Sequence, residues 1–185
     1  DAAIRAREAS KLADMLGTLD RMPKPLIGRI HGQAFGGGVG MVSVCDVAIG
    51  ATGAKFGLTE TKLGLIPATI GPYVVARMGA ARARRVFMSA RIFDASEAVD
   101  LGLLARAVDA GALDAAIEAE IVPYLACAPG AVADAKALIA KLDPRVTDAT
   151  VAMTIDALVR RWESEEAQEG IAAFFDKRKA NWVDS

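Results

Sequence analysis

The stretch that decides the fold is FGGGVG at residues 35–40, read together with AKFGLTE at residues 54–60 and LGLIP at residues 63–67. The glycine run follows a predicted strand and opens a predicted helix. Because glycine has no side chain, three adjacent glycines let a ligand approach backbone N–H groups closely. The second stretch places one carboxylate, Glu60, at the start of a short helical turn. Backbone donors beside one carboxylate suit chemistry next to a carbonyl, where an oxyanion must be held and a proton moved.

Composition indicates a soluble, globular domain. The chain has 185 residues, of which 53% are hydrophobic and 24% charged, and its formal net charge is −1. That balance lacks the basic footprint of a nucleic-acid-binding protein, and no apolar run approaches the roughly 20 residues that cross a bilayer. The single histidine, His31, excludes a histidine-based zinc cluster, and we expect no metal. We predict cytoplasmic localisation, with Cys45 and Cys127 buried as small hydrophobic residues.

Apolar periodicity predicts a strand–turn–helix–strand unit after an N-terminal helix. The helix covers residues 4–22, and Pro23 and Pro25 end it. A helix of small residues follows the glycine turn and ends near Val44. Apolar runs predict strands at residues 26–30 and 46–51, and residues 55–57 are predicted as a short extended piece. This order indicates an α/β unit with a right-handed crossover.

The chain becomes helical after Pro67. Asp94 and Glu97 have the spacing of a capping box, Gly102 is expected to end that helix, and residues 103–108 are predicted as a strand. From Leu113 onward, helices are predicted with interruptions at Pro129, Pro144 and Gly170. Two apolar stripes on these helices indicate core or subunit contact, the first at Val151, Ile155, Leu158, Val159 and Trp162 and the second at Ile171, Phe174, Phe175, Arg178 and Trp182.

The glycine run has competing interpretations. Counting G-x-G-x-x-G from Gly36 or Gly38 puts Met41 or Ser43 in the last position, so the dinucleotide fingerprint fails. The Gly-Lys-Ser/Thr of a P-loop and the Ser between glycines of a nucleophile elbow are both absent. On the glycines alone, a tight turn with close helix–strand packing remains an open alternative.

The order of these motifs resembles the enoyl-CoA hydratase/isomerase (crotonase) superfamily over essentially the whole chain. The resemblance lies in residues 24–27, 31–38, 45–48, 54–67, 89–103 and 175–181. It implies an α/β fold in which residues 1–110 form part of a spiral of stacked ββα units. It also implies that residues 111–185 form helices that build a homotrimer or a dimer of trimers. The GVG and IPATI variants at residues 38–40 and 66–70 resemble the methylglutaconyl-CoA hydratase branch.

The resemblance implies an acyl-CoA thioester substrate, with coenzyme A as part of it and no further cofactor. Two backbone N–H groups would hold the thioester oxygen, one of them from Gly37 beside Gly36, where the helix dipole favours a negative enolate oxygen. Glu60 matches a catalytic glutamate. Ala68 matches the residue whose N–H helps to hold the water, and we expect that donor to be available. Lys177 matches a lysine near the CoA phosphates, or is an ordinary solvated residue.

Each of these residues also has a plainer interpretation. Without the resemblance, Glu60 would be a solvated first-turn glutamate beside a Thr59 cap; with it, apolar neighbours would raise the pKa of its carboxyl by desolvation. Tyr73 either lines the acyl pocket or packs in the core. His31, near the turn, is expected to be structural rather than catalytic, and Asp46 is expected to cap local N–H groups.

Two departures from the family pattern leave the function open. The first spiral units, the other oxyanion donor and much of the CoA adenine pocket have no counterpart here. Two-carboxylate hydratases carry Glu two residues after the glycine triplet, where this chain has Gly40. We predict an enzyme of fatty acid metabolism that carries out syn hydration of a straight or branched 2-enoyl-CoA with Glu60. The alternatives are Δ3–Δ2 enoyl-CoA isomerisation by the same carboxylate and a catalytically silent subunit.

Overall fold

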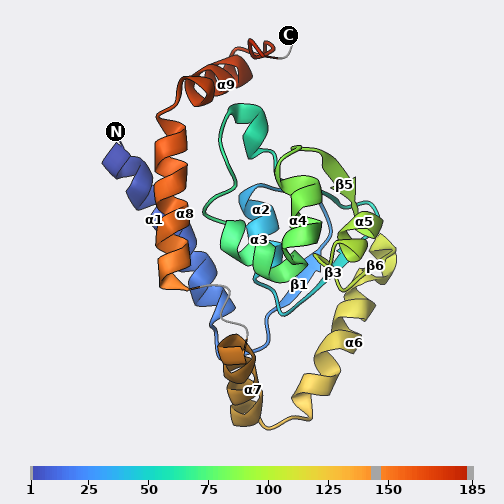
Figure 1. The fold of residues 1–185 in the computed structure, drawn as a ribbon. Helices are drawn as coiled ribbons and strands as arrows, with labels where there is room; N and C mark the ends of the chain where they lie inside the picture. The colour runs from blue at the N-terminus through green and yellow to red at the C-terminus, as the bar shows by residue number, and fades with distance from the viewer. Residues whose placement is uncertain (1, 143–146, 183–185) are drawn as a thin grey trace.

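The computed structural model describes residues 2–142 and 147–182. Helices surround a body of short strands, and the first helix, α1 (Ala2–Asp20), runs beside α8 (Asp148–Trp162) (Figure 1). The predicted N-terminal helix is therefore confirmed, and Pro23 and Pro25 follow its end because proline cannot continue a helix. This pairing of the two ends of the chain forms one side of the candidate site.

The first sheet contains three parallel strands in the order β1 (Ile27–Ile30), β3 (Val47–Ala51) and β6 (Arg106–Val108). The helix of small residues, α2 (Gly37–Ser43), lies between β1 and β3 in sequence, as predicted. The predicted strand at 103–108 begins only at Arg106. Residues 103 and 104 donate their N–H groups to the carbonyl of Ala98 and so close the preceding helix.

The second sheet has the order β2 (Ala34–Phe35), β4 (Lys55–Gly57) and β5 (Ile92–Asp94), with β2 parallel and β5 antiparallel to β4. Only β4 was predicted. Phe56 and Phe93 are partners in the register of β4 and β5, and their rings stack at 5.7 Å. This sheet fixes the glycine turn, because the N–H of Gly36 donates to the carbonyl of Gly57 at 2.9 Å.

Three short helices follow in the chain: α3 (Gly71–Met78), which packs on α2, α4 (Ala80–Phe87), which packs on α3, and α5 (Ala95–Asp100), which contacts strands of both sheets. The Asp94 side chain accepts a hydrogen bond from the Glu97 N–H at 2.9 Å, so the predicted cap of α5 is confirmed. The reciprocal half of the capping box is replaced, because the Glu97 carboxylate binds Arg91 at 2.6 Å. Gly102, at a φ of 77°, follows the end of α5 as expected.

The C-terminal part is helical, as predicted. It contains the short 3₁₀ helix η2 (Ala110–Ala112), then α6 (Leu113–Leu125), α7 (Pro129–Leu142), α8 and α9 (Glu165–Phe175). Pro129 begins α7, Pro144 lies outside the described residues, and the predicted interruption at Gly170 is wrong because Gly170 lies inside α9. Within the described ranges, no single helix is long and apolar enough to cross a membrane; only the bent pair Ala110–Leu125 and Pro129–Leu142 passes that test together.

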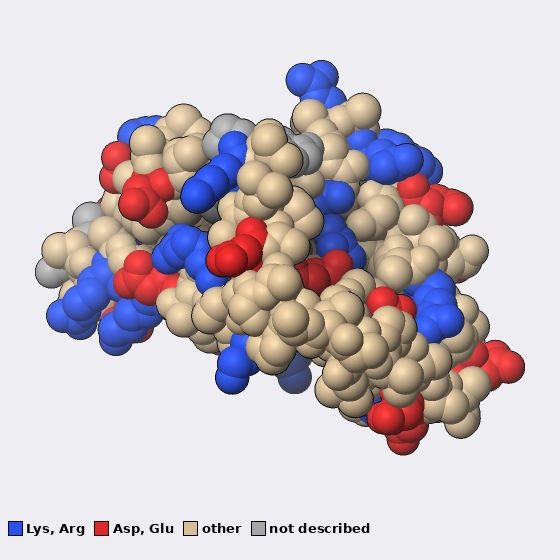
Figure 2. Space-filling view, turned by 90° about the horizontal axis from the view of Figure 1, so that it is seen from below, with Lys and Arg blue, Asp and Glu red and all other residues tan. Residues whose placement is uncertain are grey.

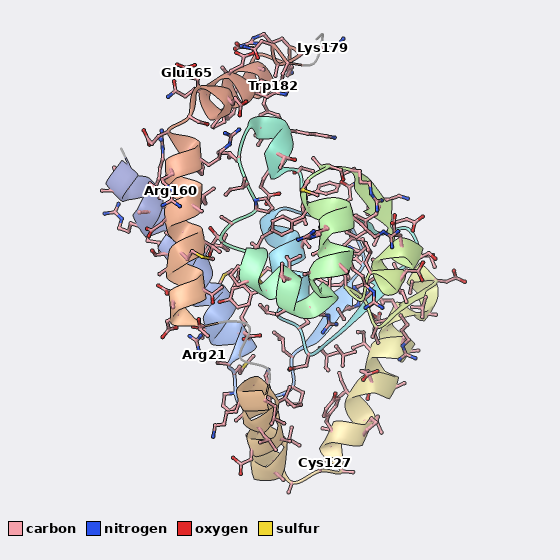
Figure 3. All side chains as sticks on the ribbon, viewed as in Figure 1. Arg21, Cys127, Arg160, Glu165, Lys179 and Trp182 are labelled. Atoms are coloured by element: carbon pink, nitrogen blue, oxygen red, sulfur yellow. The ribbon has the colours of Figure 1, made fainter. Side chains whose placement is uncertain are left out.

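The main core joins α1, α2, α3 and β4 through Leu16, Val39, Val74 and Phe56. Cys45 belongs to this core, but Cys127 is exposed at the turn between α6 and α7, so the prediction that it is buried is wrong (Figure 3). Asp46 accepts a hydrogen bond from the Leu26 N–H at 2.7 Å, so it caps a backbone donor that lies 20 residues away in sequence rather than a local one.

Candidate active site

Glu60 opens the 3₁₀ helix η1 (Glu60–Leu63), which confirms the predicted short helical turn. Gly64, at a φ of 69°, ends η1, and the N–H of Leu65 then donates to the carbonyl of Glu60 at 3.1 Å. Thr59 precedes η1 but its side chain makes no capping hydrogen bond, so the cap predicted there is wrong. The backbone of the turn, rather than a cap, fixes the position of Glu60.

Gly36 lies directly against the Glu60 carboxylate. A Cβ atom at position 36 would lie 3.1 Å from Oε1 of Glu60, and the φ of Gly36 is +50°. Both observations favour glycine here, because other residues rarely adopt this backbone conformation and a side chain would crowd the carboxylate. The glycine run and the 54–60 segment therefore meet, as their separate motifs suggested.

A cavity of about 120 Å³ lies at this meeting point. Gly37, Glu60 and Ala68 line it, although they come from three different segments of the chain. The remaining wall is almost entirely apolar and is formed by Leu12, Leu65, Ile66, Pro67, Ile70, Leu158 and Trp162, with Thr69 as the exception. The structure thus brings together three of the residues that the sequence pointed to.

The Glu60 carboxyl is placed where its proton is held more tightly than usual. Burial raises its pKa, and a hydrogen bond from its own backbone opposes this with a smaller effect. Its Oε2 atom is buried and has no hydrogen-bond partner among the described residues. A carboxyl whose pKa is raised toward neutrality suits a group that must both accept and return a proton.

The Gly37 N–H is free for the role that the resemblance implies, which is to hold the thioester oxygen. Gly37 is the first residue of α2, so its N–H has no partner within the helix, and no acceptor for it is found in the described ranges. A Cβ at position 37 would meet nothing within 4 Å, so space is open beside this backbone. The N–H is therefore available to a ligand in the cavity.

Ala68 differs from the expectation. Its N–H donates to the carbonyl of Ile66 at 2.8 Å, across the tight turn at Pro67, so this donor is already used. Ala68 still lines the cavity. A water molecule held beside Glu60 therefore needs a partner other than the N–H predicted for it.

Gly40 is closed off by packing. A Cβ at position 40 would lie only 2.6 Å from Cγ2 of Ile70, a distance that real Cβ contacts do not reach. Ile70 itself lines the cavity. The place where two-carboxylate hydratases carry their other glutamate is thus occupied by an apolar side chain, and Glu60 is the carboxylate among the residues that line the cavity.

Tyr73, Lys177 and His31 lie apart from this cavity. Tyr73 is buried in the core, its hydroxyl is 3.4 Å from the carbonyl of Ala13, and it borders a different hollow, which supports the core-packing interpretation. Lys177 is exposed just beyond α9, at a φ of 55°, in the tail that continues to Lys179 and Trp182 (Figure 3). His31 is exposed and does not line the cavity.

Sequence reasoning missed the wall that α1 and α8 contribute. Leu12, Leu158 and Trp162 line the cavity, although helical spacing assigned Leu158 and Trp162 only to core or subunit contact. Arg5 of α1 pairs with Glu163 and lies over the Trp162 ring at 5.5 Å, which fixes that ring in place. Apolar periodicity alone cannot separate a cavity wall from an ordinary core stripe.

The helix α9 packs directly on η1, where the main chains meet at two glycines. A Cβ at Gly170 would lie 2.6 Å from the Leu63 carbonyl carbon, and a Cβ at Gly64 would lie 2.4 Å from the main-chain carbonyl oxygen of Glu166. Arg161 also donates to the carbonyl of Gly64 at 2.5 Å and pairs with Glu166. The C-terminal helices thereby hold the turn that carries Glu60.

The residues that the structure describes include no group of three or more His, Cys, Asp or Glu side chains that could hold a metal ion. The chemistry that this arrangement can support is proton transfer by Glu60 next to an oxygen held at Gly37.

The family model for enoyl-CoA hydratase/isomerase matches residues 3–185. The chain belongs to this family.

Relatives of known name agree with the family. The chain is 38% identical to the enoyl-CoA hydratase ACTT6 of Alternaria alternata over 131 residues, 70% of this chain and 44% of that protein. It is 33% identical to the crotonyl-CoA hydratase of Syntrophomonas wolfei over 191 residues, covering 98% of this chain and 70% of that one. Methylglutaconyl-CoA hydratase of Rattus norvegicus is 37% identical over 101 residues, 54% of this chain.

The fold comparison agrees as well. The structure of an enoyl-CoA hydratase from Mycobacterium avium aligns with a TM-score of 0.92 at 30% identity and covers 98% of this chain and 72% of that chain. The expected α/β crotonase-like fold with a helical C-terminal region is therefore confirmed. The chain spans less than half of the length of the Alternaria relative and 70% of the Syntrophomonas relative.

Proposed function

We propose that the protein hydrates a short, uncharged 2-enoyl-CoA thioester. The observation that carries this proposal is the meeting of the half-buried Glu60 carboxyl, whose pKa is raised by burial, with the unpaired N–H of Gly37 in one apolar cavity. Family membership supports it, because the relatives with high coverage are named as hydratases.

The cavity supports a small acyl group. Its volume of about 120 Å³ is below that of the roughly 150 Å³ cavity known to take up benzene, which favours a short acyl group. A methylglutaconyl group carries a second carboxylate, and the lining residues include no Lys, Arg or His to pair with it. An uncharged acyl group such as crotonyl matches this lining better.

The reaction would proceed by general acid–base catalysis at one carboxylate. The Glu60 carboxylate takes a proton from water as the water oxygen bonds to the β carbon, and the double-bond electrons move toward the thioester oxygen. The Gly37 N–H donates a hydrogen bond to that oxygen; removing one such donor typically costs about 10²–10³ in rate. Glu60 then returns its proton to the α carbon, and the net result is addition of water.

One observation favours a second candidate function. Because Ile70 fills the space at Gly40, the cavity lacks a second carboxylate to orient water. Moving a double bond from the Δ3 to the Δ2 position needs only one group that removes and returns a proton, and Glu60 meets that requirement. Isomerisation is therefore the alternative that the experiment must distinguish from hydration.

We further propose that the chain self-associates through its C-terminal helices, as a homotrimer or a dimer of trimers. Large apolar side chains are exposed on α6, α7 and α8, among them Leu125, Ile139, Leu142 and Met153. Figure 2, which views the molecule from below, shows broad uncharged areas between scattered charges of both signs. Multi-angle light scattering of the full chain tests the assembly.

We also propose that Lys177 contacts the CoA phosphates. We propose the cytoplasm as the compartment in which the protein works.

The test is a set of assays with crotonyl-CoA, methylglutaconyl-CoA and a 3-enoyl-CoA, using the full chain, Glu60→Gln and the control Glu118→Gln on an exposed face of α6. We expect Glu60-dependent loss of the 2-enoyl absorbance with crotonyl-CoA and an unchanged control. Appearance of that absorbance from the 3-enoyl substrate alone would identify an isomerase. No turnover with any of the three would support a catalytically silent subunit.

A further inference from the structure

Two side-chain oxygens in the described ranges are buried without a hydrogen-bond partner, Oε2 of Glu60 and Oγ1 of Thr69. Both residues line the same cavity. Thr69 is only 4% exposed, so bulk solvent does not satisfy its hydroxyl. A buried hydroxyl left unpaired typically costs about 1–3 kcal/mol, so two such atoms at one cavity indicate a shared partner inside it.

The backbone donor next to Thr69 in sequence is not that partner. The Ala68 N–H, one residue before Thr69, already donates to Ile66. The other lining side chains are apolar, and Ile70 fills the space toward Gly40. The cavity, at about 120 Å³, is many times larger than the roughly 10–15 Å³ that one water molecule requires. The cavity therefore has room for a water molecule, and such a water would satisfy both oxygens.

We propose that Thr69 Oγ1 and Glu60 Oε2 hold one water molecule between them, and that this is the water added to the substrate. This inference rests on the proposed hydration. Thr69 would accept a hydrogen bond from the second hydrogen of the water while the first passes to Glu60. No bond to Thr69 forms or breaks. The threonine thus takes over the water-holding task of the carboxylate that Gly40 and Ile70 exclude.

Three variants of the full chain separate this role from simple packing. Thr69→Val keeps the shape and removes the hydroxyl, Thr69→Ser keeps the hydroxyl, and Glu60→Gln tests the proposed function itself. We expect Thr69→Val to lower kcat for hydration of crotonyl-CoA about ten-fold, with KM within about two-fold. Thr69→Ser should stay within about three-fold of wild type. If Thr69 served only in packing, Thr69→Val and Thr69→Ser would both have a lower melting temperature than the wild type.

A crystal structure of the wild-type protein provides a readout besides activity. We expect an ordered water within hydrogen-bond distance of both oxygens, and its loss in Thr69→Val. A kcat of Thr69→Val equal to that of the wild type, or a crystal structure with no water at this position, would overturn the inference. Either result would leave hydration by Glu60 intact. If the wild type fails to hydrate any 2-enoyl-CoA, the proposed function fails, and the assignment of this water to catalysis falls with it even if the crystal shows it bound.

Discussion

Ile70 occupies the space that a side chain at Gly40 would need, with its Cγ2 atom 2.6 Å from the position of a Cβ there. The two residues lie on different elements, Gly40 within α2 and Ile70 at the start of α3. Glycine at one position and a large apolar residue at the other therefore form a packing pair, and this pair leaves no room for a glutamate side chain at position 40.

This pair should show strong energetic coupling. Gly40→Ala is expected to lower the free energy of unfolding by about 1–2 kcal/mol, because overpacking costs more than the roughly 1 kcal/mol that alanine gains in a helix. Ile70→Ala should also destabilise, by leaving a cavity. The double variant should lose less than the sum of the two losses in urea denaturation. Additive losses would show that the two positions do not compete for space.

Glu60→Gln should stabilise the protein near neutral pH. The pKa of Glu60 is raised in the folded protein, so the folded state resists ionisation, and this cost is present only when the pH lies above the unfolded-state pKa. The variant should therefore melt above wild type at pH 7 to 8. The difference should shrink as the pH falls toward 4, where Glu60 is protonated in both states. Calorimetry over this range checks the sign, and a wild type that is more stable at pH 8 would contradict it.

The contact between α9 and η1 should not tolerate a methyl group. Gly170→Ala places a Cβ 2.6 Å from main-chain atoms of Leu63, which cannot move aside as a flexible side chain can. We expect a loss of about 1–3 kcal/mol in stability and reduced activity, because η1 carries Glu60. Gly130→Ala in α7, where a Cβ meets nothing within 4 Å, is the matched control and should be as stable as wild type or more stable by up to about 1 kcal/mol.

Trp162 should limit the length of the acyl group. Its ring closes the cavity from α8, so Trp162→Ala enlarges the space beside Glu60. The ratio of kcat/KM for an eight-carbon over a four-carbon 2-enoyl-CoA should rise about ten-fold or more, given the 10- to 200-fold discrimination of apolar pockets per methylene. Arg160→Ala, on the exposed face of the same helix, should leave the ratio unchanged. An unchanged ratio in Trp162→Ala would show that the acyl group does not bind beside Trp162.

The sequence was sufficient to predict the parts of the fold and the site that depend on local pattern. The N-terminal helix, the strands at residues 27–30 and 47–51, and the turn that begins at Glu60 follow from periodicity, proline and glycine. The strands β2 and β5 were not predicted because β2 has only two residues and lies within the glycine turn, and β5 runs directly into the cap of α5, so neither shows an alternating pattern.

The parts of the site that depend on distances between elements could not be predicted. The engaged N–H of Ala68 follows from the geometry of the turn at Pro67, and the closed space at Gly40 follows from how α2 meets Ile70. The unpaired hydroxyl of Thr69 is visible only once its surroundings are known. Trp162 is separated from Glu60 by most of the chain, and an apolar stripe does not reveal which of its members border a cavity.

The main-chain contact between α9 and η1 has a consequence for how order at the site is maintained. Gly64 and Gly170 bring the two backbones together without intervening side chains, so no flexible side chain separates α9 from the turn that carries Glu60. Opening of α9 would therefore remove the backbone contact that supports the turn, and we expect the order of η1 to depend on how well α9 is docked. Hydrogen exchange of the amides at the end of η1 would consequently report the local unfolding of a helix that begins about one hundred residues further along the chain.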